Sequence, residues 1–423
     1  MSTSTRRGGS GPTLPRGGGA GAARQSTLRE HNLAVVLERV IGAHAVGTPL
    51  SRSGIAGEVG LARATVSDLV DRLIGARLVT ELDPLTSPGA GRPAVPLAPT
   101  ARSVVGLGLS VGTDHLAALV VDLTGLTVTQ RVVEADLRGR DPAETLAQLA
   151  ELAADARRAV LAQGMVVAGA CVALPGLVSR ESARLRYAPN LGWQDLGVDT
   201  ALHAHPDLAS LPVTAANDAD LAARTEVEER RRRERAPVEE QSYLFVYGAV
   251  GIGSAVVLGG QVFGGLHGWS GEIGHVLVDP KGPPCHCGSD GCLEPYAGRE
   301  ALATCAGLPL DTSVQALAHA AAAPGPVADA VAAAGASLGQ AAATVVNVVD
   351  VDEVVLGGIY APLFAGLAPT VLAELERRAL IARWSSIRLT KAVGGTNAAA
   401  RGAALVVLDD VVADPSRWLG GPT

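Results

Sequence analysis

Hydrophobic residues recur at helical spacing near the start of the chain, which predicts an amphipathic helix beginning near Ser26. The next segment, residues 51–82, divides into two short helices around Gly60 and Leu61. Two helices joined by a tight turn form a helix-turn-helix, whose second helix enters the major groove of DNA. The apolar positions of the first helix are Leu33, Val36, Leu37, Val40 and Ile41.

The second helix of this motif is expected from about residue 62 to residue 74. Arg63 is the expected base contact, because a guanidinium group matches the two acceptors of guanine. Thr65 and Ser67 are short hydroxyl donors suited to phosphates, although Ser and Thr are also common in the first turn of any helix. Ala62 stands where a capping Ser or Thr is usual, so the buried face has to hold the helix. The predicted interior consists of Ile55, Ala56, Val59, Leu61, Val66, Leu69, Val70 and Leu73.

A proline-rich segment, residues 83–100, follows these helices and has no helical face. It predicts a wing loop and then a linker. Within it, Gly91-Arg92-Pro93 places one arginine on a stiff, extended stretch, a shape that suits a narrow minor groove. The alternative is a linker arginine in water. We favour the groove, so Arg92 joins the candidate DNA contacts of a winged helix-turn-helix.

From Val104 the pattern changes to strands alternating with helices, which is typical of an α/β fold. We divide the chain into a disordered tail (1–25), a winged helix-turn-helix with its linker (26–100) and an α/β domain (101–423). A run of mixed charges at 224–240 nearly balances acids with arginines, which predicts a solvated helix and loop. Strands are predicted at 104–111, 116–123, 127–137 and 166–173, and a helix at 142–163.

Charge separates the two ends of the chain. The 423 residues carry a net charge of −7, yet residues 1–100 contain 11 Arg and 7 acids, about +4, which leaves about −11 for the rest. The basic end is therefore the expected nucleic-acid end. The sequence after Arg6 and Arg7 lacks the apolar stretch of a secretory signal, and no run approaches the roughly 20 apolar residues of a membrane helix. We expect a cytoplasmic protein with no membrane partner.

Three of the five cysteines lie within eight residues, which suggests a metal site. Cys285, Cys287 and Cys292 supply three thiolates from a glycine-rich turn, and His275 lies ten residues upstream on a segment that can fold back. Three sulfurs and one imidazole close a tetrahedral Zn²⁺ site without an open position, which is the form of a structural zinc. The alternative is a set of ordinary buried thiols, and the clustering favours metal.

The glycine-rich segment 248–275 and the CHCGSDGCLE cluster resemble the ROK family of sugar kinases and sugar-sensing repressors, over roughly residues 28–410. The segments ALPGLVS (173–179), APNLGW (188–193) and AANDADLAA (215–223) are similar to other family segments. The resemblance implies an actin-like (ribonuclease H-like) domain of two α/β lobes with sugar in the cleft and a winged helix in front. It also implies that the sugar hydroxyls are bound by Asn217, Asp218, Glu272, His275 and Glu294, with His275 bridging sugar and zinc.

The residues expected to bind the nucleotide phosphates decide between a kinase and a regulator. Asp218 matches the general base of the kinases, and its other role would be hydroxyl binding alone. Kinases of the family open the domain with Asp-x-Gly-x-Thr, whose acid supports magnesium. Here Gly108 and Ser110 take the places where that acid could align, and Asp114 lies beyond the turn. Without the acid the γ-phosphate loses its main stabilisation, so we expect Asp218 to be vestigial and catalysis to be absent.

Two hypotheses follow. The first is a sugar-responsive regulator, with repression expected, that binds operator DNA and takes a sugar or sugar phosphate as effector. The resemblance supports a homodimer or homotetramer, which fits palindromic operators.

The second hypothesis is an active ATP-dependent sugar kinase with a fused DNA-binding domain. It is favoured by Asp218 and by glycine turns at 251–253 and 356–358 that could cradle nucleotide. Glycine turns also occur for structural reasons. A regulator without an effector would leave the predicted sugar residues without a purpose.

Overall fold

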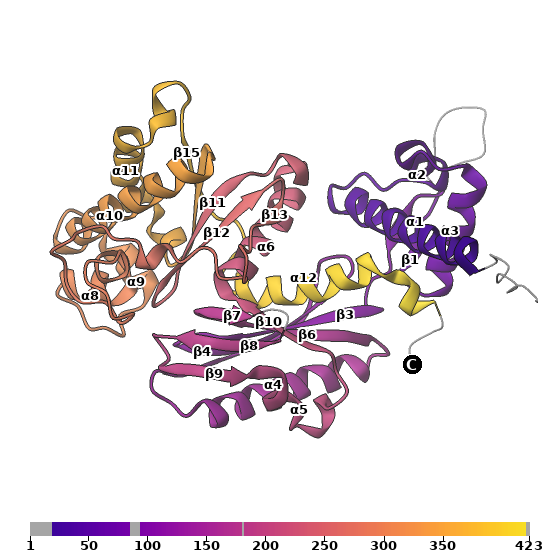
Figure 1. Cartoon of the computed structure of the whole chain (residues 1–423), viewed down its shortest axis with the longest axis horizontal. Coiled ribbons are helices and arrows are strands. Elements are labelled where there is room, and N and C mark those ends of the chain that lie inside the picture. The colour runs from indigo at the N-terminus through magenta and orange to yellow at the C-terminus, as the bar shows by residue number, and fades with distance from the viewer. Residues whose placement is uncertain (1–18, 85–93, 180–181, 420–423) are drawn as a thin grey trace, which may run out of the picture.

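The computed structural model describes residues 19–84, 94–179 and 182–419, with side chains from residue 28 (Figure 1). Residues 1–18 and Arg92 lie outside this range. The first helix begins at Gly19, ahead of the predicted start near Ser26. The N-terminal unit consists of α1 (Gly19–Ala45), α2 (Arg52–Val59), α3 (Arg63–Gly75), β1 (Val79–Glu81) and β2 (Leu97–Pro99).

The helix-turn-helix forms as its sequence predicts. Ser51 caps α2 by accepting a hydrogen bond from the Gly54 amide (3.3 Å), and Gly60 ends it in the left-handed conformation (φ 70°). Ala62 provides no side-chain cap to α3, as expected. The helix is held instead by its buried apolar face, which consists of Val66, Leu69, Val70 and Leu73.

A short hairpin completes the winged helix. β1 and β2 pair antiparallel, with Glu81 opposite Leu97. Leu97 and Ala98 are buried, so the end of the proline-rich segment is part of the folded wing rather than a linker. The ladder hydrogen bonds need no donor from Pro99, because a proline at a strand end leaves the pairing intact.

Two lobes with the same strand order follow the winged helix. Among the described residues, the first sheet has the order β10-β6-β3-β4-β5 and the second the order β13-β12-β11-β14-β15. In each sheet three consecutive strands form an antiparallel meander, and the next strand pairs parallel with the first of them. This repeated topology confirms the expected actin-like fold of two α/β lobes.

The first lobe contains β3 (Val104–Val111), β4 (His115–Asp122), β5 (Thr127–Glu134), α4 (Pro142–Leu161), β6 (Val166–Leu174), β7 (Leu177–Ser179), β8 (Arg184–Ala188), β9 (Trp193–Gly197), α5 (Val198–His203), the 3₁₀ helix η1 (Pro206–Leu208), β10 (Val213–Asn217), α12 (Ala398–Ala413) and η5 (Pro415–Trp418). The strands predicted at 104–111 and 166–173 and the helix predicted at 142–163 are confirmed within two residues at each end.

The second lobe contains η2 (Val238–Glu240), β11 (Tyr243–Gly248), β12 (Ile252–Leu258), β13 (Gln261–Val262), η3 (Ile273–His275), α7 (Glu294–Ala297), α8 (Arg299–Cys305), α9 (Val314–Ala320), α10 (Pro326–Val349), β14 (Glu353–Gly358), α11 (Tyr360–Arg378), η4 (Leu380–Arg383) and β15 (Arg388–Lys391). α10 is long and apolar enough to cross a membrane by composition, but half of its most apolar window is buried. It packs on α11 as a core helix of this lobe.

α6 (Asp218–Glu234) lies between the lobes and corrects one prediction. The charged run at 224–240 was expected to form a solvated helix, yet residues 225–230 of α6 are buried. Arg230 forms ion pairs with Glu226 (3.0 Å) and with Glu353 on β14 (2.8 Å). The charges of this helix therefore face partners inside the protein, which is why their near balance does not indicate a solvated face.

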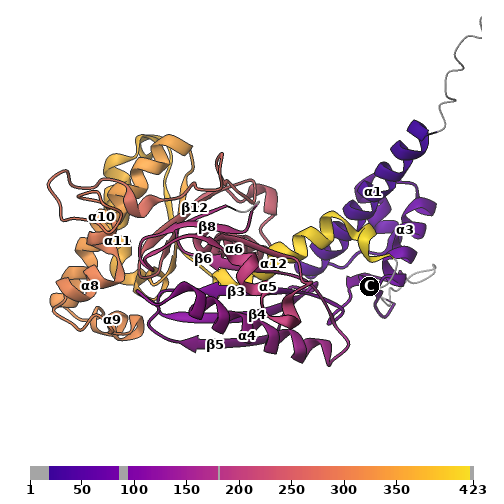
Figure 2. The ribbon, with the colours of Figure 1, turned by 60° about the horizontal axis from the view of Figure 1, so that its bottom comes forward.

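The last helix, α12, joins the winged helix to the body. It lies across the first sheet and points towards α1 (Figures 1 and 2). Its close approach requires glycine in β3, because a methyl group at Gly108 would lie 1.8 Å from the carbonyl oxygen of Ala400. One apolar cluster combines Val36, Val70, Leu119, Ala404 and Leu408 from α1, α3, β4 and α12. The winged helix therefore shares a core with the first lobe.

Candidate sugar and metal site

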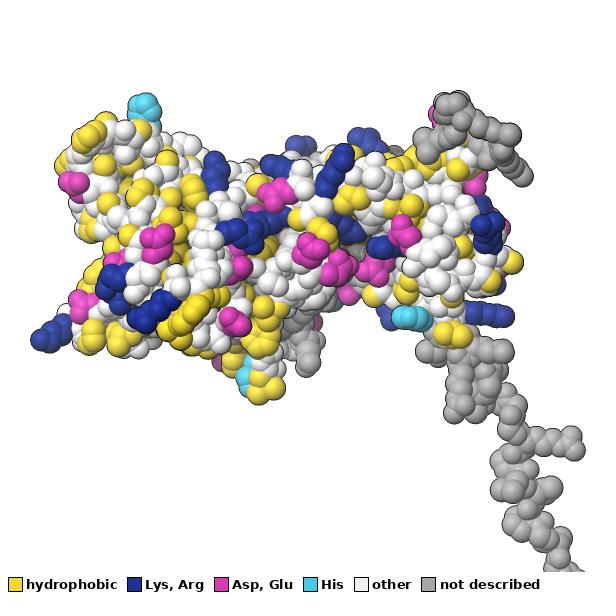
Figure 3. Space-filling view, turned by 90° about the horizontal axis from the view of Figure 1, so that it is seen from above, with side chains coloured by type: hydrophobic (Ala, Val, Ile, Leu, Met, Phe, Trp, Pro, Cys, Tyr) yellow, Lys and Arg dark blue, Asp and Glu magenta, His cyan; other side chains and the backbone are white. Residues whose placement is uncertain are grey.

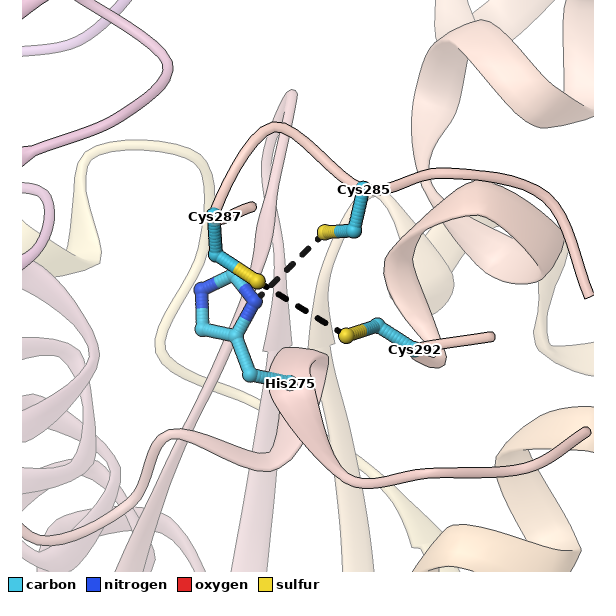
Figure 4. Close-up of side chains that lie close together, drawn as sticks. All are labelled: His275, Cys285, Cys287 and Cys292. Atoms are coloured by element: carbon cyan, nitrogen blue, oxygen red, sulfur yellow. Dashed lines mark hydrogen bonds between the residues drawn. The ribbon is translucent and has the colours of Figure 1, made fainter. Parts of the chain in front are cut away.

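The three predicted thiolates and the predicted imidazole meet at one point. Their possible ligand atoms all lie within 4.8 Å of one another. Cys285 Sγ is 3.7 Å from His275 Nδ1, and Cys287 Sγ is 3.7 Å from Cys292 Sγ (Figure 4). Tetrahedral zinc with sulfur at ~2.3 Å separates two sulfurs by about 3.8 Å, whereas a disulfide needs ~2.05 Å. The cluster therefore has the dimensions of a metal site and not of a disulfide.

Glycine allows this cluster to form. The Cys285 amide donates to the Ser289 carbonyl (2.8 Å), which closes the turn that carries two of the thiols. Gly291 adopts a positive φ of 71°, and a methyl group there would lie 1.8 Å from the carbonyl oxygen of Asp279. An alanine at residue 291 would push this segment away from residues 277–279, which follow His275.

His275 connects the metal cluster to the predicted sugar residues. It ends the short helix η3, so its Nδ1 faces the thiols while its Nε2 lies 3.9 Å from Glu272 Oε2. The two nitrogens of one imidazole are thus directed at different groups. The Glu272 carboxylate lies beyond hydrogen-bond distance of Nε2, so this nitrogen keeps its capacity for another partner.

Glu294 begins α7, two residues after Cys292, and forms the wall of the cleft. Its Oε2 accepts hydrogen bonds from Asn190 Nδ2 (3.2 Å) and from the Ile252 amide (3.3 Å). Glu294 is 9% exposed, and its Oε1 is buried without a hydrogen-bond partner among the described residues. A buried acceptor of this kind requires a donor to offset its lost hydration. The side chain borders a cavity of about 600 Å³.

Asn217 and Asp218 lie where β10 ends and α6 begins. Asn217 caps α6 through its Oδ1, which accepts from the Ala219 amide (2.8 Å), while its Nδ2 donates to the Gly176 carbonyl (3.0 Å). Burial, together with the nearby charge of Glu272, raises the pKa of Asp218 to about 7, although the Ala219 amide opposes this shift. Burial and the charge of Glu294 also raise the pKa of Glu272, against the effect of His275. The pKa of Asp218 thus responds to the charge of Glu272, and the pKa of Glu272 to the charge of Glu294.

The phosphate side of the cleft lacks an acid in β3. Ser110 is buried at 4% exposure between β4 and β6, and Gly108 has no room for a side chain. Asp114 pairs with His115 Nδ1 (2.8 Å) and with Arg299 of α8 (2.9 Å), so an arginine already neutralises it. Asp114, the acid nearest in sequence to the position expected for the magnesium-supporting acid, is thus engaged in ion pairs.

Close packing explains why glycine occurs in the turns at 251–253 and 356–358. A methyl group at Gly251 would lie 2.4 Å from both Asn190 Nδ2 and Glu294 Oε2. Gly358 has a positive φ of 59°, and a methyl group there would lie 1.9 Å from the carbonyl oxygen of Gly248. Close packing therefore accounts for both turns without a nucleotide.

The predicted DNA contacts differ in their surroundings. Arg63 and Thr65 are exposed in the first turn of α3. Ser67 is half-buried, and its Oγ and carbonyl oxygen accept hydrogen bonds from Arg52 (3.1 and 3.2 Å). Arg52 also pairs with Asp71 (2.6 Å), so it braces α2 against α3.

Sequence analysis missed two partners of the sugar residues. Asn190 donates to Glu294 from the APNLGW segment, and the Gly176 carbonyl accepts from Asn217. Both lie in segments that the sequence analysis had marked only as family-like. Their contacts join residues 104 and 41 positions apart, and no local pattern encodes such pairs.

A two-lobed actin-like body with a thiol-imidazole cluster beside its cleft, preceded by a winged helix, defines a class of protein. The ROK family model matches residues 106–410, and the chain belongs to that family. It is 27% identical over 282 residues to the xylose repressor of Bacillus spizizenii, covering 66% of this chain and 69% of the relative.

Two solved structures share the fold. A ROK family transcriptional regulator, described as a homologue of the Escherichia coli MLC protein, covers 93% of this chain and 100% of its own, with a TM-score of 0.74 and 24% identity. The ROK hexokinase of Thermus thermophilus covers 73% of this chain and 99% of its own, with a TM-score of 0.56 and 28% identity. The regulator structure therefore matches a larger part of this chain than the kinase structure does.

Proposed function

We propose that the protein is a cytoplasmic, sugar-responsive transcriptional repressor that binds operator DNA through its winged helix as a homodimer or homotetramer. A sugar in the cleft beside Asn217, Asp218, Glu272, His275 and Glu294 releases the operator. The relative named xylose repressor and the regulator structure support a regulator. The observation that carries the proposal is that a single helix, α6, begins at the predicted sugar residues Asn217 and Asp218 and ends against α1 of the winged helix.

α6 is anchored at both ends and along its length. Asn217 caps the helix and Asp218 opens its first turn, and its 17 residues span about 26 Å. In its last turn, Arg231 lies against α1, since a methyl group at Gly42 would lie 2.2 Å from its guanidinium group. Arg232 donates to the Thr124 carbonyl (2.7 Å) on the turn after β4. A shift of the first turn on sugar binding therefore moves the surface on which α1 rests.

A groove separates the winged helix from the body beside this contact. It has a volume of about 870 Å³ and lies between α1, α6 and α12. Acidic and basic side chains intermix on the face seen from above, where the winged helix meets the lobes (Figure 3). Effector binding produces allostery only if the two placements of the winged helix differ in their affinity for sugar. The groove gives the unit room for such a displacement.

We expect Arg231→Ala to uncouple the two sites. Its own operator affinity should stay within threefold of the parent, because the recognition helix is untouched. The sugar-induced loss of operator affinity should fall from the 5- to 150-fold typical of allosteric proteins to below about threefold. Fluorescence anisotropy with an operator selected from a random duplex pool, with and without saturating sugar, measures both quantities.

Arg233→Ala is the matched control for this experiment. Arg233 lies on the same turn of α6, but it is 60% exposed and pairs only with Glu229 among the described ion pairs. Its effector response should equal that of the parent. Equal losses of response in both variants, or none in Arg231→Ala, would contradict a path through the contact with α1.

We expect Arg63→Ala to reduce specific operator binding by roughly 10- to 100-fold, the loss of one bidentate base contact. Ser67→Ala should have a smaller effect, since Ser67 Oγ already accepts from Arg52. Thr65→Ala should weaken binding to all sequences to a similar degree, because a phosphate contact does not read the bases. Titration of the selected operator and of a scrambled duplex separates these outcomes.

The metal of the thiol-imidazole cluster is proposed to be a structural Zn²⁺. Three sulfurs and one nitrogen within 4.8 Å of one another match the ligand set of this ion, and all four belong to the protein. Bound there, the metal holds His275 and the start of α7 in a fixed relation. Its role is structural, and the sugar contacts are made by the side chains on either side of it.

The kinase alternative has its own test. Protein incubated with ATP, Mg²⁺ and a hexose panel should release no more ADP than the buffer control, because β3 offers no acid to support magnesium. Turnover near the 1–100 s⁻¹ of kinases would replace the repressor proposal with the kinase.

A further inference from the structure

The three thiols of the metal cluster differ in their access to solvent. Cys285 and Cys292 are buried, at 8% and 2% exposure, whereas Cys287 is half-buried. The residues beside Cys287 in the turn, 286 and 288–290, are all exposed. A methyl group at Gly288 would meet no atom within 4 Å, so open space adjoins the turn. A small oxidant in solution therefore reaches Cys287 before the other two thiols.

A second thiol lies close to Cys287. Its Sγ is 3.7 Å from the Sγ of Cys292, and the two side chains point towards each other, while Cys285 is directed at the imidazole (Figure 4). A disulfide needs ~2.05 Å, so the two sulfurs have to approach by roughly 1.7 Å. Gly288 and Gly291, both at positive φ (93° and 71°), lie between the two cysteines. Glycine has the backbone freedom that such a shift requires.

The chemical state of the cluster favours reaction with peroxides. A thiol that ligates a metal is held as a thiolate, and the thiolate is the form that a peroxide oxidises. The two cysteines outside the cluster lack this combination of ionisation, access and a neighbouring thiol. Cys171 is buried at 1% exposure, and Cys305 is exposed but lies apart from the cluster. Oxidation is therefore expected at one place in the chain.

From this arrangement we propose that Cys287 and Cys292 are an oxidation site, at which hydrogen peroxide converts the two metal-ligating thiolates into a disulfide. Cys287 Sγ attacks one peroxide oxygen, the O–O bond breaks, and the departing hydroxide takes a proton to become water. Cys292 Sγ then attacks the sulfenic sulfur of Cys287. The S–S bond forms, the S–O bond breaks, and the second hydroxide also takes a proton. The two sulfurs together lose two electrons, and one peroxide is reduced to two waters.

The disulfide removes two of the four ligands of the cluster. Cys285 and His275 alone do not close a tetrahedral site, so the segment that leads to Glu294 loses its anchor. The winged helix packs on the first lobe, and its hold on the operator is unaffected. This consequence rests on the proposed function and adds a regulation to it. The oxidised protein stays on the operator and no longer responds to effector.

Full-length protein loaded with zinc tests the oxidation site directly. The protein is treated with hydrogen peroxide at tenfold molar excess, zinc release is followed with a chromogenic chelator, and disulfides are mapped by mass spectrometry after alkylation. We expect about one zinc per chain to be released, a disulfide between Cys287 and Cys292, and reversal of both by dithiothreitol with added ZnCl₂. Retained zinc, or a disulfide that joins another pair of cysteines, would overturn the proposal.

Cys287→His separates the exposed thiol from the metal site. The variant keeps four donors, because two cysteines with two histidines also hold structural zinc. Peroxide-driven zinc release should slow at least tenfold in Cys287→His and stay at the parent rate in Cys305→Ser, whose cysteine lies outside the cluster. Equal rates in the parent and in Cys287→His would contradict attack at Cys287. Should Cys287→His bind no zinc, the disulfide mapped in the parent decides.

The regulatory consequence has a separate readout. Operator release by a panel of aldopentoses, aldohexoses and N-acetylhexosamines is measured before and after oxidation. A sugar that releases the operator from the reduced protein should need at least tenfold higher concentration after oxidation, with recovery on reduction. Unchanged sensitivity in protein that carries the mapped disulfide would overturn the regulation. No release from the reduced protein by any sugar would count against the repressor proposal alone, because zinc release and the mapped disulfide decide the oxidation site.

Discussion

Cys287→Ser is expected to lower bound zinc from about one atom per chain to nearly none, and to weaken effector binding more than tenfold. Zinc in such sites contributes on the order of 10 kcal/mol to the structure around it. Here that structure includes His275, which faces Glu272, and Glu294, which lies two residues after Cys292. Loss of the metal therefore releases one wall of the sugar cleft. Metal analysis by mass spectrometry and sugar titration followed by melting temperature give both numbers.

Operator affinity in the absence of sugar should remain within threefold of the parent in this variant. The winged helix packs on α12 and the first sheet, whereas the cluster belongs to the second lobe. Measurements use the full chain, because the winged helix shares its core with the body. Cys305→Ser is the matched control, since this cysteine is exposed and lies outside the cluster. An intact effector response in zinc-free Cys287→Ser would refute the link between metal and sugar wall.

The metal cluster and the helix-turn-helix could be predicted because their determinants are local. Cys285, Cys287 and Cys292 lie on one turn, and His275 is only ten residues away, so spacing alone indicates a shared site. The interior of α3 repeats every three or four residues, and Val66, Leu69 and Leu73 are buried as the period requires. Both patterns are complete within segments that fold on themselves.

The environment of α6 could not be predicted for the opposite reason. Its charged residues look solvated in sequence, and their partners lie far along the chain. Arg224 pairs with Asp409 on α12 (2.8 Å), 185 residues away, and Arg230 reaches Glu353, 123 residues away. Thr225 donates to the Ala398 carbonyl (2.6 Å). Only the packing of α6 between the lobes reveals that its charges face inward.

Arg230→Met is expected to reduce the free energy of unfolding by about 3–5 kcal/mol, the cost of removing one partner of a buried ion pair. The variant leaves the carboxylate of Glu226, whose side chain is 0% exposed, without a guanidinium partner, whereas Glu353 keeps its ion pair with Arg388 (2.9 Å). Thr390 Oγ1 still donates to Glu353 (2.7 Å), and the Val393 and Gly394 amides still donate to Glu226. These neutral donors do not replace the lost charge.

Urea denaturation at pH 7 should show a lower midpoint for Arg230→Met at an unchanged slope, which isolates stability from compactness. Arg233→Met, on the same helix with its guanidinium group 60% exposed, should cost less than about 1 kcal/mol, as surface pairs do. Adding Glu226→Gln to Arg230→Met should recover much of the loss, because the uncompensated charge is then gone. Equal small losses for Arg230→Met and Arg233→Met would show that α6 is not fixed by its buried charges. The helix would then lack the rigid anchorage to the second lobe that the proposed coupling between the sugar residues and α1 requires.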